Sequence, residues 1–185
     1  MTIIALATMN ARYSHASFGL RYLMANLGEL ETETAMLEFD IHQRPMDVAE
    51  TILRHEPRII GLGVYIWNVV PITEVARILK RLRPDITLII GGPEVSHEHD
   101  TQPICAVADY VITGEADLTF PMLCRDLVAG RRPVSKMIFS GPPDTTKIAL
   151  PYRLYTEEDI RNRVIYVEAS RGCPFTCEFC LSSLD

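Results

Sequence analysis

Five short apolar runs alternate with segments of helical apolar spacing along the first 130 residues of the chain. Most residues of these runs are apolar, and the first run, within residues 2–7, is continuously so, which is typical of a strand buried on both faces of a parallel sheet. Parallel neighbours need crossover connections, so the alternation predicts a parallel sheet with helices on both faces and right-handed crossovers. The expected topology is flavodoxin-like (Rossmann-like), strand order 2-1-3-4-5. The predicted strands lie at residues 2–7, 34–39, 58–64, 87–90 and 110–113.

The segments between these runs have apolar residues three and four positions apart, the spacing of an amphipathic helix. They predict helices near residues 19–30, 46–55, 71–83 and 118–128. Residues 97–102 are polar, so the fourth crossover is expected to be short or irregular.

The chain changes character after residue 130, where prolines become frequent. Residues 131–163 are interpreted as a linker with a small hairpin, its strands near 136–139 and 147–150, and a short helix. Thr156 precedes three acidic residues and is the predicted N-cap of that helix. Residues 164–167 are expected to form one more strand.

Composition narrows the possible partners and compartments. The hydrophobic fraction of 48% supports a packed core, and the net charge of −6 argues against nucleic acid as the main partner. The apolar runs are too short to span a bilayer, and the N-terminus lacks the features of a signal peptide. Five cysteines, three of them clustered, indicate a reducing compartment and predict a cytoplasmic protein without a membrane partner.

The clustered cysteines are Cys173, Cys177 and Cys180, spaced C-x3-C-x2-C. Three thiolates on one loop can hold three corners of an iron–sulfur cluster and leave the fourth iron open to a ligand. The alternative is a zinc site, but structural zinc normally takes four protein ligands, and the nearest histidine is His99, far upstream. The remaining cysteines, Cys105 and Cys124, lie in apolar surroundings and are expected to be buried.

Polar and glycine residues follow the predicted strands, at the edge where open parallel sheets bind ligands. Glycine there permits close approach of a large ligand, although each glycine could instead serve only a tight turn. The candidate binding residues are Ser14, His15, Gly63, Tyr65, Trp67, Asn68, Gly91, Gly92, Pro93, Glu94, Gly114 and Glu115, with Phe179 beside the last cysteine.

The cysteine segment, with Arg171-Gly172 before it and Phe179 within it, resembles the cluster loop of the radical S-adenosylmethionine (SAM) superfamily. Together with the sheet loops it resembles the cobalamin-binding subgroup, in which a flavodoxin-like cobalamin module precedes a radical SAM barrel. The resemblance implies a 4Fe-4S cluster on Cys173, Cys177 and Cys180, SAM on the open iron, and cobalamin at the sheet edge. It also places Gly91 and Gly92 beside the nucleotide tail of the cobalamin and makes residues 164–185 the start of the barrel.

One departure from that subgroup concerns the loop after the first strand. Modules that ligate cobalt from the lower face carry Asp-x-His-x-x-Gly, whereas here Tyr13 stands two places before His15 and Gly19 is one place too far. His15 is therefore expected to be a polar loop residue rather than a cobalt ligand. Tyr65 and Trp67 would pack either against the corrin or within the protein. A large side chain at Gly92 is expected to fill the cleft and leave the fold intact.

The leading hypothesis is the N-terminal part of a radical SAM enzyme that binds cobalamin and a 4Fe-4S cluster. Its chemistry would be methyl transfer or rearrangement on an unactivated carbon of a small-molecule or peptide substrate bound outside this sequence. Two alternatives stay open: a module that no longer binds cobalamin and recruits partners or substrates, and a non-enzymatic zinc protein.

Overall fold

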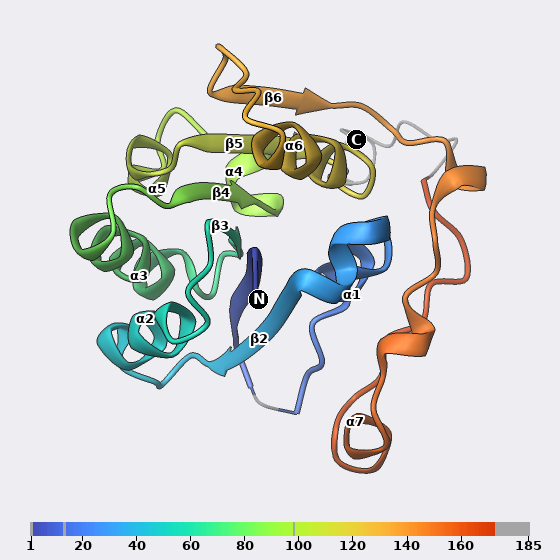
Figure 1. The fold of residues 1–185 in the computed structure, drawn as a ribbon. Helices are drawn as coiled ribbons and strands as arrows, with labels where there is room; N and C mark the ends of the chain where they lie inside the picture. The colour runs from blue at the N-terminus through green and yellow to red at the C-terminus, as the bar shows by residue number, and fades with distance from the viewer. Residues whose placement is uncertain (1, 13, 98, 173–185) are drawn as a thin grey trace.

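The chain folds into a six-stranded parallel sheet with strand order β2-β1-β3-β4-β5-β6 (Figure 1). A computed structural model describes residues 2–12, 14–97 and 99–172. The strands are β1 (Ile4–Asn10), β2 (Thr34–Asp40), β3 (Ile59–Gly63), β4 (Thr87–Gly91), β5 (Tyr110–Gly114) and β6 (Met137–Ser140). The predicted parallel sheet and the 2-1-3-4-5 order of its first five strands are confirmed.

Helices cover both faces of the sheet, each over its own apolar core. Three helices pack on one face: α2 (Pro45–Leu53), α3 (Val69–Leu82) and α5 (Pro103–Val107). Two helices pack on the other face: α1 (Phe18–Ala25) and α6 (Thr119–Val128) (Figure 1). Successive β1 residues alternate between the two cores, Ile4 and Leu6 facing one and Ala5 and Ala7 the other. Both faces of the sheet are therefore buried against helices, which explains why the strands are mostly apolar instead of alternating between apolar and polar residues.

The connections include several short helical segments. The fourth crossover consists of α4 (Pro93–Ser96) and α5, which confirms the expected short, irregular connection. Short 3-10 helices form η1 (Gly28–Glu33), η2 (Thr145–Lys147) and η3 (Tyr152–Leu154). The predicted cap of the last helix, α7 (Glu157–Asn162), is confirmed: the Thr156 side chain accepts from the Asp159 N–H, and the Asp159 carboxylate accepts from the Thr156 N–H.

The expected hairpin after residue 130 is wrong. Its first half is β6, which pairs parallel to β5, and residues 148–150 form no strand among the residues the structure describes. The free edge of β5 offers unpaired backbone groups, and β6 satisfies them, so this segment belongs to the α/β domain rather than to a linker. The strand expected at 164–167 is reduced to a single parallel bridge between Val164 and His15.

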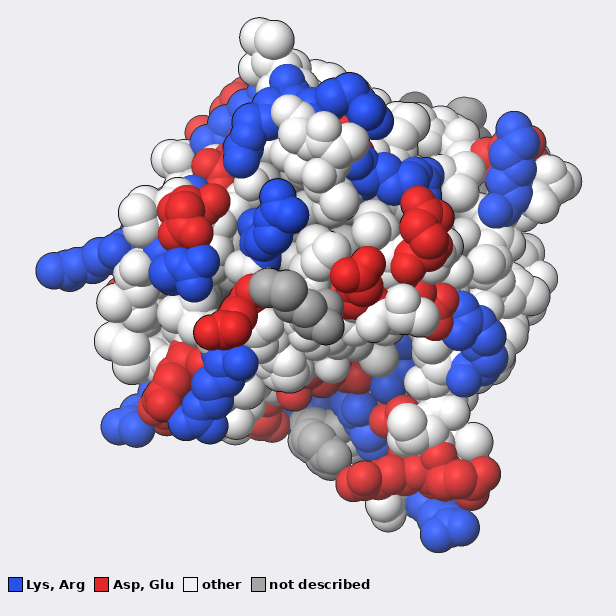
Figure 2. Space-filling view, viewed as in Figure 1, with Lys and Arg blue, Asp and Glu red and all other residues white. Residues whose placement is uncertain are grey.

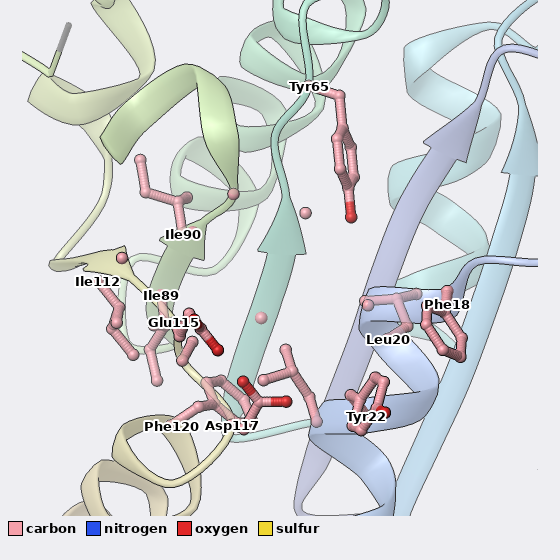
Figure 3. Close-up of a pocket in the computed structure, with 18 of the residues that line it drawn as sticks. Phe18, Leu20, Tyr22, Tyr65, Ile89, Ile90, Ile112, Glu115, Asp117 and Phe120 are labelled. Carbon is pink, nitrogen blue, oxygen red and sulfur yellow. The ribbon is translucent and has the colours of Figure 1, made fainter. Parts of the chain in front are cut away.

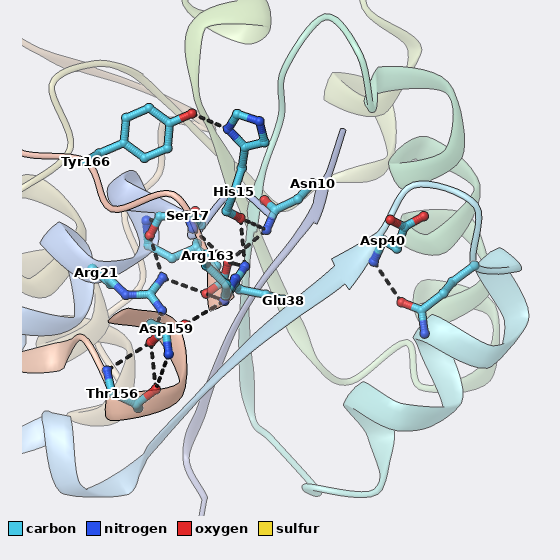
Figure 4. Close-up of polar contacts among 12 residues, drawn as sticks. Asn10, His15, Ser17, Arg21, Glu38, Asp40, Thr156, Asp159, Arg163 and Tyr166 are labelled. Atoms are coloured by element: carbon cyan, nitrogen blue, oxygen red, sulfur yellow. Dashed lines mark hydrogen bonds and ion pairs between the residues drawn. The ribbon is translucent and has the colours of Figure 1, made fainter. Parts of the chain in front are cut away.

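A buried ion-pair network joins the C-terminal segment to the α/β domain (Figure 4). Arg21 of α1 and Arg163 each contact Glu38 of β2 and Asp159 of α7, at distances between 2.6 and 2.9 Å. The two cations and two anions balance, as buried charges must. The Arg163 guanidinium also donates to the His15 carbonyl (2.7 Å), so the network positions the loop that follows β1.

The surface carries charges of both signs. Figure 2 shows Lys and Arg side chains interspersed with Asp and Glu side chains over the face drawn there. Within the described part of the chain, no helix combines the length and apolar character needed to cross a membrane.

Candidate functional site

A cavity of about 770 Å³ lies on the α1 and α6 side of the sheet, toward the carboxyl ends of β3, β4 and β5. Figure 3 shows Phe18, Leu20 and Tyr22 of α1 on one side of it. Glu115, Asp117 and Phe120 lie on the opposite side, and the Tyr65 ring points between the two walls. The cavity therefore stands at the sheet edge where parallel α/β folds bind ligands.

Glycines form the floor of the cavity. Gly61 and Gly63 are two positions apart on β3 and face the same side, and Gly63 is paired in register with Gly91 of β4. At Gly91 an added Cβ would meet only one atom within 4 Å, the Ile112 carbonyl oxygen at 3.4 Å. The cavity is therefore open over Gly91, whereas at Gly61 and Gly63 the side chains of Leu6, Phe120, Thr8 and Tyr65 already lie 2.9–3.3 Å from the Cβ position.

Position 92 requires glycine because of its backbone conformation, whether or not a ligand occupies the cavity. Its φ is +119°, and a Cβ at this position would lie 2.4 Å from the Val64 carbonyl oxygen. The expectation that a large side chain at Gly92 would fill the cleft and leave the fold intact is therefore wrong, because the side chain would collide with the backbone after β3. Gly91, with its ordinary backbone, is the position from which a side chain can enter the cavity.

Six of the predicted binding residues line the cavity: Gly63, Tyr65, Gly91, Gly92, Gly114 and Glu115. Ser14, His15, Trp67, Asn68, Pro93 and Glu94 are not among its lining residues. Pro93 and Glu94 begin α4, and the Glu94 carboxylate accepts from the Gln102 amide (2.8 Å).

Asn68 is buried, and its side chain forms hydrogen bonds with the loop that follows β3. Its amide donates to the Met9 carbonyl (3.0 Å) and the Gly63 carbonyl (3.1 Å), and its Oδ1 accepts from the Tyr65 N–H (2.8 Å). Because these bonds use both ends of the amide, Asn68 holds Tyr65 in place rather than contacting a ligand. Trp67 stacks on Tyr65, the two rings nearly parallel with their centroids 4.6 Å apart, and remains 44% exposed.

His15 is engaged by the C-terminal segment. Its Nδ1 contacts the Tyr166 hydroxyl, and its carbonyl accepts from the Asn10 amide (2.9 Å) and from Arg163 (Figure 4). These contacts agree with the expectation of a polar loop residue that forms hydrogen bonds.

The most polar part of the cavity surrounds Arg171. Its guanidinium forms ion pairs with Glu115 (3.0 Å), Asp117 (3.0 Å) and Glu168 (2.9 Å), and its Cζ lies 4.5 Å from the centroid of the Tyr22 ring. The Tyr22 hydroxyl donates to Glu168 (2.5 Å). One cation thus faces three carboxylates at the boundary between the cavity and solvent.

The environment shifts the pKa values of these groups in different directions. Burial raises the pKa of Glu115 despite the nearby Arg171 cation. The hydrogen bond from Arg171 holds the pKa of Glu168 below its usual range. Burial and the Glu168 carboxylate together raise the pKa of Tyr22, so its hydroxyl stays a donor at neutral pH.

Many lining residues of this cavity were not among the predicted binding residues, and those with aromatic or charged side chains include Phe18, Tyr22, Asp117, Glu168 and Arg171. Asp117 stood in the glycine-containing loop after the fifth predicted strand and could have been included. Phe18 and Tyr22 are four positions apart and so share one face of α1, but helical spacing alone does not tell a cavity wall from a core face.

The predicted cluster ligands Cys173, Cys177 and Cys180, and the neighbouring Phe179, lie outside the described residues. Within residues 2–172, as far as the structure describes them, no group of three or more His, Cys, Asp or Glu could hold a metal ion. Cys124 is buried as expected, and that burial raises the pKa of its thiol to about 12. Cys105 is partly buried and packs against the core on the α2 and α3 face of the sheet.

Comparisons with known proteins bear on this cavity. The model of the B12 binding domain family matches residues 4–124. An uncharacterised methyltransferase of Pyrococcus horikoshii is 29% identical over 160 residues, which cover 75% of this chain and 34% of that protein. The cobalamin-dependent radical SAM methyltransferase TokK of Streptomyces tokunonensis is 26% identical over 155 residues, covering 68% of this chain and 22% of that protein.

A solved structure shares the fold. The radical SAM methyltransferase TsrM from Kitasatospora setae superposes with a TM-score of 0.60 at 17% identity, covering 74% of this chain and 27% of that one. The chain spans about a third or less of the length of the curated relatives named above.

Proposed function

The chain belongs to the B12-binding domain family, and from that premise we propose that its cavity receives the nucleotide tail of a cobalamin whose corrin ring lies over the carboxyl edge of the sheet. The observation that carries this proposal is the cavity between α1 and α6, which Gly61, Gly63 and Gly91 line and which is open over Gly91. In parallel α/β sheets that edge is the usual ligand position.

The described residues fit such a tail. A cavity of about 770 Å³ falls in the size range of pockets that enclose a ligand of drug size. Phe18, Leu20 and Phe120 offer apolar and aromatic surface for a flat base, and backbone at Gly91 and Gly92 can approach the tail without an intervening Cβ. Tyr65, held by Asn68, and its stacking partner Trp67 lie at the end of β3, where a corrin ring would rest.

Methyl transfer is the activity we propose for the whole protein. Both relatives compared above carry methyltransferase names, and one of them is named as cobalamin-dependent and radical SAM. Cys173, Cys177 and Cys180 would hold a 4Fe-4S cluster that binds SAM. The cofactors supply the radical and methyl-carrying chemistry, and the residues described here bind, orient and keep water from the cobalamin.

A matched pair of glycine substitutions tests cobalamin binding. Gly91→Leu should place its side chain in the cavity, because the backbone is ordinary there and the nearest obstacle is 3.4 Å away. Gly141→Leu is the control, since nothing lies within 4 Å of its Cβ position. In an absorbance titration we expect Gly91→Leu to weaken hydroxocobalamin binding at least tenfold, which corresponds to about 1.4 kcal/mol of binding free energy. The circular dichroism spectrum should stay unchanged.

Equal affinity in wild type and Gly91→Leu would place the cobalamin elsewhere. A wild-type chain that binds none would instead favour a recruitment module that has lost the cofactor. The cluster has a separate test: after anaerobic reconstitution with iron and sulfide, a broad visible absorption should appear that the triple variant Cys173→Ala, Cys177→Ala, Cys180→Ala lacks. A colourless protein holding zinc would contradict the cluster.

A further inference from the structure

Residues 168–172 cross the mouth of the cavity from one wall to the other. Ser170, Arg171 and Gly172 are among the residues that line the cavity, although they belong to neither wall. Arg171 contacts the Tyr22 ring on the α1 side and the carboxylates of Glu115 and Asp117 on the β5 side. We call residues 168–172 the strap.

The contacts that attach the strap differ between its two ends. At Glu168, the backbone N–H donates to the Tyr152 hydroxyl (3.0 Å), and the carboxylate accepts from the Tyr22 hydroxyl. At Arg171, the attachment across the cavity consists of side-chain ion pairs and a ring contact. Arg171 is therefore the group whose release would free the strap from the β5 wall.

We propose that the Arg171 ion pairs are a latch that holds the strap over the cavity, and that the strap must lift before the nucleotide tail of cobalamin can enter or leave. The proposal rests on the proposed function and adds control of access to it. The Arg171 side chain is 18% exposed, and those of its partners Asp117 and Glu115 are 10% and 31% exposed, so the latch is partly shielded from solvent and from salt.

The latch has a kinetic consequence that a merely stabilising contact lacks. When a site is accessible only in a minor open state, the observed association rate equals the rate of the open state multiplied by the fraction of molecules that are open. Loosening the latch raises that fraction both in the free and in the loaded protein. Association and dissociation should therefore accelerate together, with little change in affinity, whereas loss of a simple ligand contact accelerates dissociation alone.

Stopped-flow absorbance with hydroxocobalamin separates these cases in the full chain. Arg171→Gln should raise both rates, by on the order of tenfold, and Arg171→Lys should restore part of the slow kinetics. The control is Arg153→Gln, which breaks an ion pair to Glu31 elsewhere on the same C-terminal segment. Unchanged association in Arg171→Gln, with normal binding by the wild type, would overturn the latch and leave the proposed function standing.

A measurement without any ligand tests the latch independently of cobalamin. Trypsin cleaves after arginine only where the backbone can open, so the Arg171–Gly172 bond reports on the strap. The double variant Glu115→Gln, Asp117→Asn keeps this bond but removes the two carboxylates that hold Arg171 to the β5 wall, and cleavage there should accelerate on the order of tenfold. Glu31→Gln, the matched control, should not change it. Cleavage at equal rates in both variants would refute the latch whether or not cobalamin binds.

Discussion

Glu38→Gln is expected to destabilise the protein severely, because Glu38 is the centre of the buried network in Figure 4. Its carboxylate accepts five hydrogen bonds: two from Arg163 (2.7 and 3.1 Å) and one each from Arg21 (2.6 Å), Ser17 N–H (2.7 Å) and Asn10 (2.8 Å). Glutamine has nearly the same shape, so the substitution creates no cavity. It offers one acceptor oxygen, however, and turns an amide donor toward these donors.

The magnitude follows from charge balance. Two arginines and two carboxylates make the network neutral. The arginine side chains are 2% and 6% exposed and the carboxylate side chains 10% and 7%, so little water reaches the network. Removing one carboxylate leaves a buried positive charge without compensation, which costs about 3–5 kcal/mol. Since single domains are stable by about 5–15 kcal/mol, the loss should be a large fraction of the free energy of unfolding.

Urea unfolding at pH 7, followed by far-ultraviolet circular dichroism, measures this loss. The control is Glu31→Gln, whose partner Arg153 is 55% exposed, and for which we expect about 0–1 kcal/mol. Unfolding midpoints that coincide for the two variants would refute the argument from buried charge. Faster trypsin cleavage beside Arg161 and Arg163 at an unchanged midpoint would instead show that only the C-terminal segment undocks.

Three further predictions concern single positions. His15→Ala should leave hydroxocobalamin affinity largely intact in a titration, because its ring contacts Tyr166; a loss of about 10–100-fold would identify it as a cobalt ligand. Gly92→Ala should lower the free energy of unfolding by about 1–3 kcal/mol, because φ is +119° and the Val64 carbonyl blocks a Cβ. Gly28→Ala, at φ +62° with open space around it, should cost clearly less in the same urea experiment. Asp159 has its pKa lowered to about 2 from an ordinary 3.8, because hydrogen bonds from Thr156 and Arg163 outweigh the opposing effect of burial. The charged form is favoured by folding, so its stabilisation is complete above about pH 4 and is lost as the pH falls toward 2; Asp159→Asn should flatten the decline of the urea midpoint over that window.

The sheet could be predicted because its information is local. The first five strands are mostly apolar, a pattern that a short window of sequence displays even where β2 also carries Glu38, and the alternation with helices then restricts the topology. The glycines after the strands marked the binding edge for the same reason. The sixth strand was missed, because the four residues Met137–Ser140 are equally compatible with a hairpin, and the choice depended on the free edge of β5.

The walls of the cavity and both charged clusters were decided by tertiary structure. Arg171 and Glu115 are 56 positions apart, and Arg21 and Asp159 are 138 apart. Each of these residues, taken alone in the sequence, is typical of a solvated surface position. Apolar periodicity records which side of an element is buried, but it does not record which polar groups meet across the fold. The sequence by itself therefore determined the first five strands of the sheet, the edge at which the cavity lies and the cysteine spacing, while the pairing of Arg171 across the cavity exists only once α1, the β5 loop and the strap are brought together.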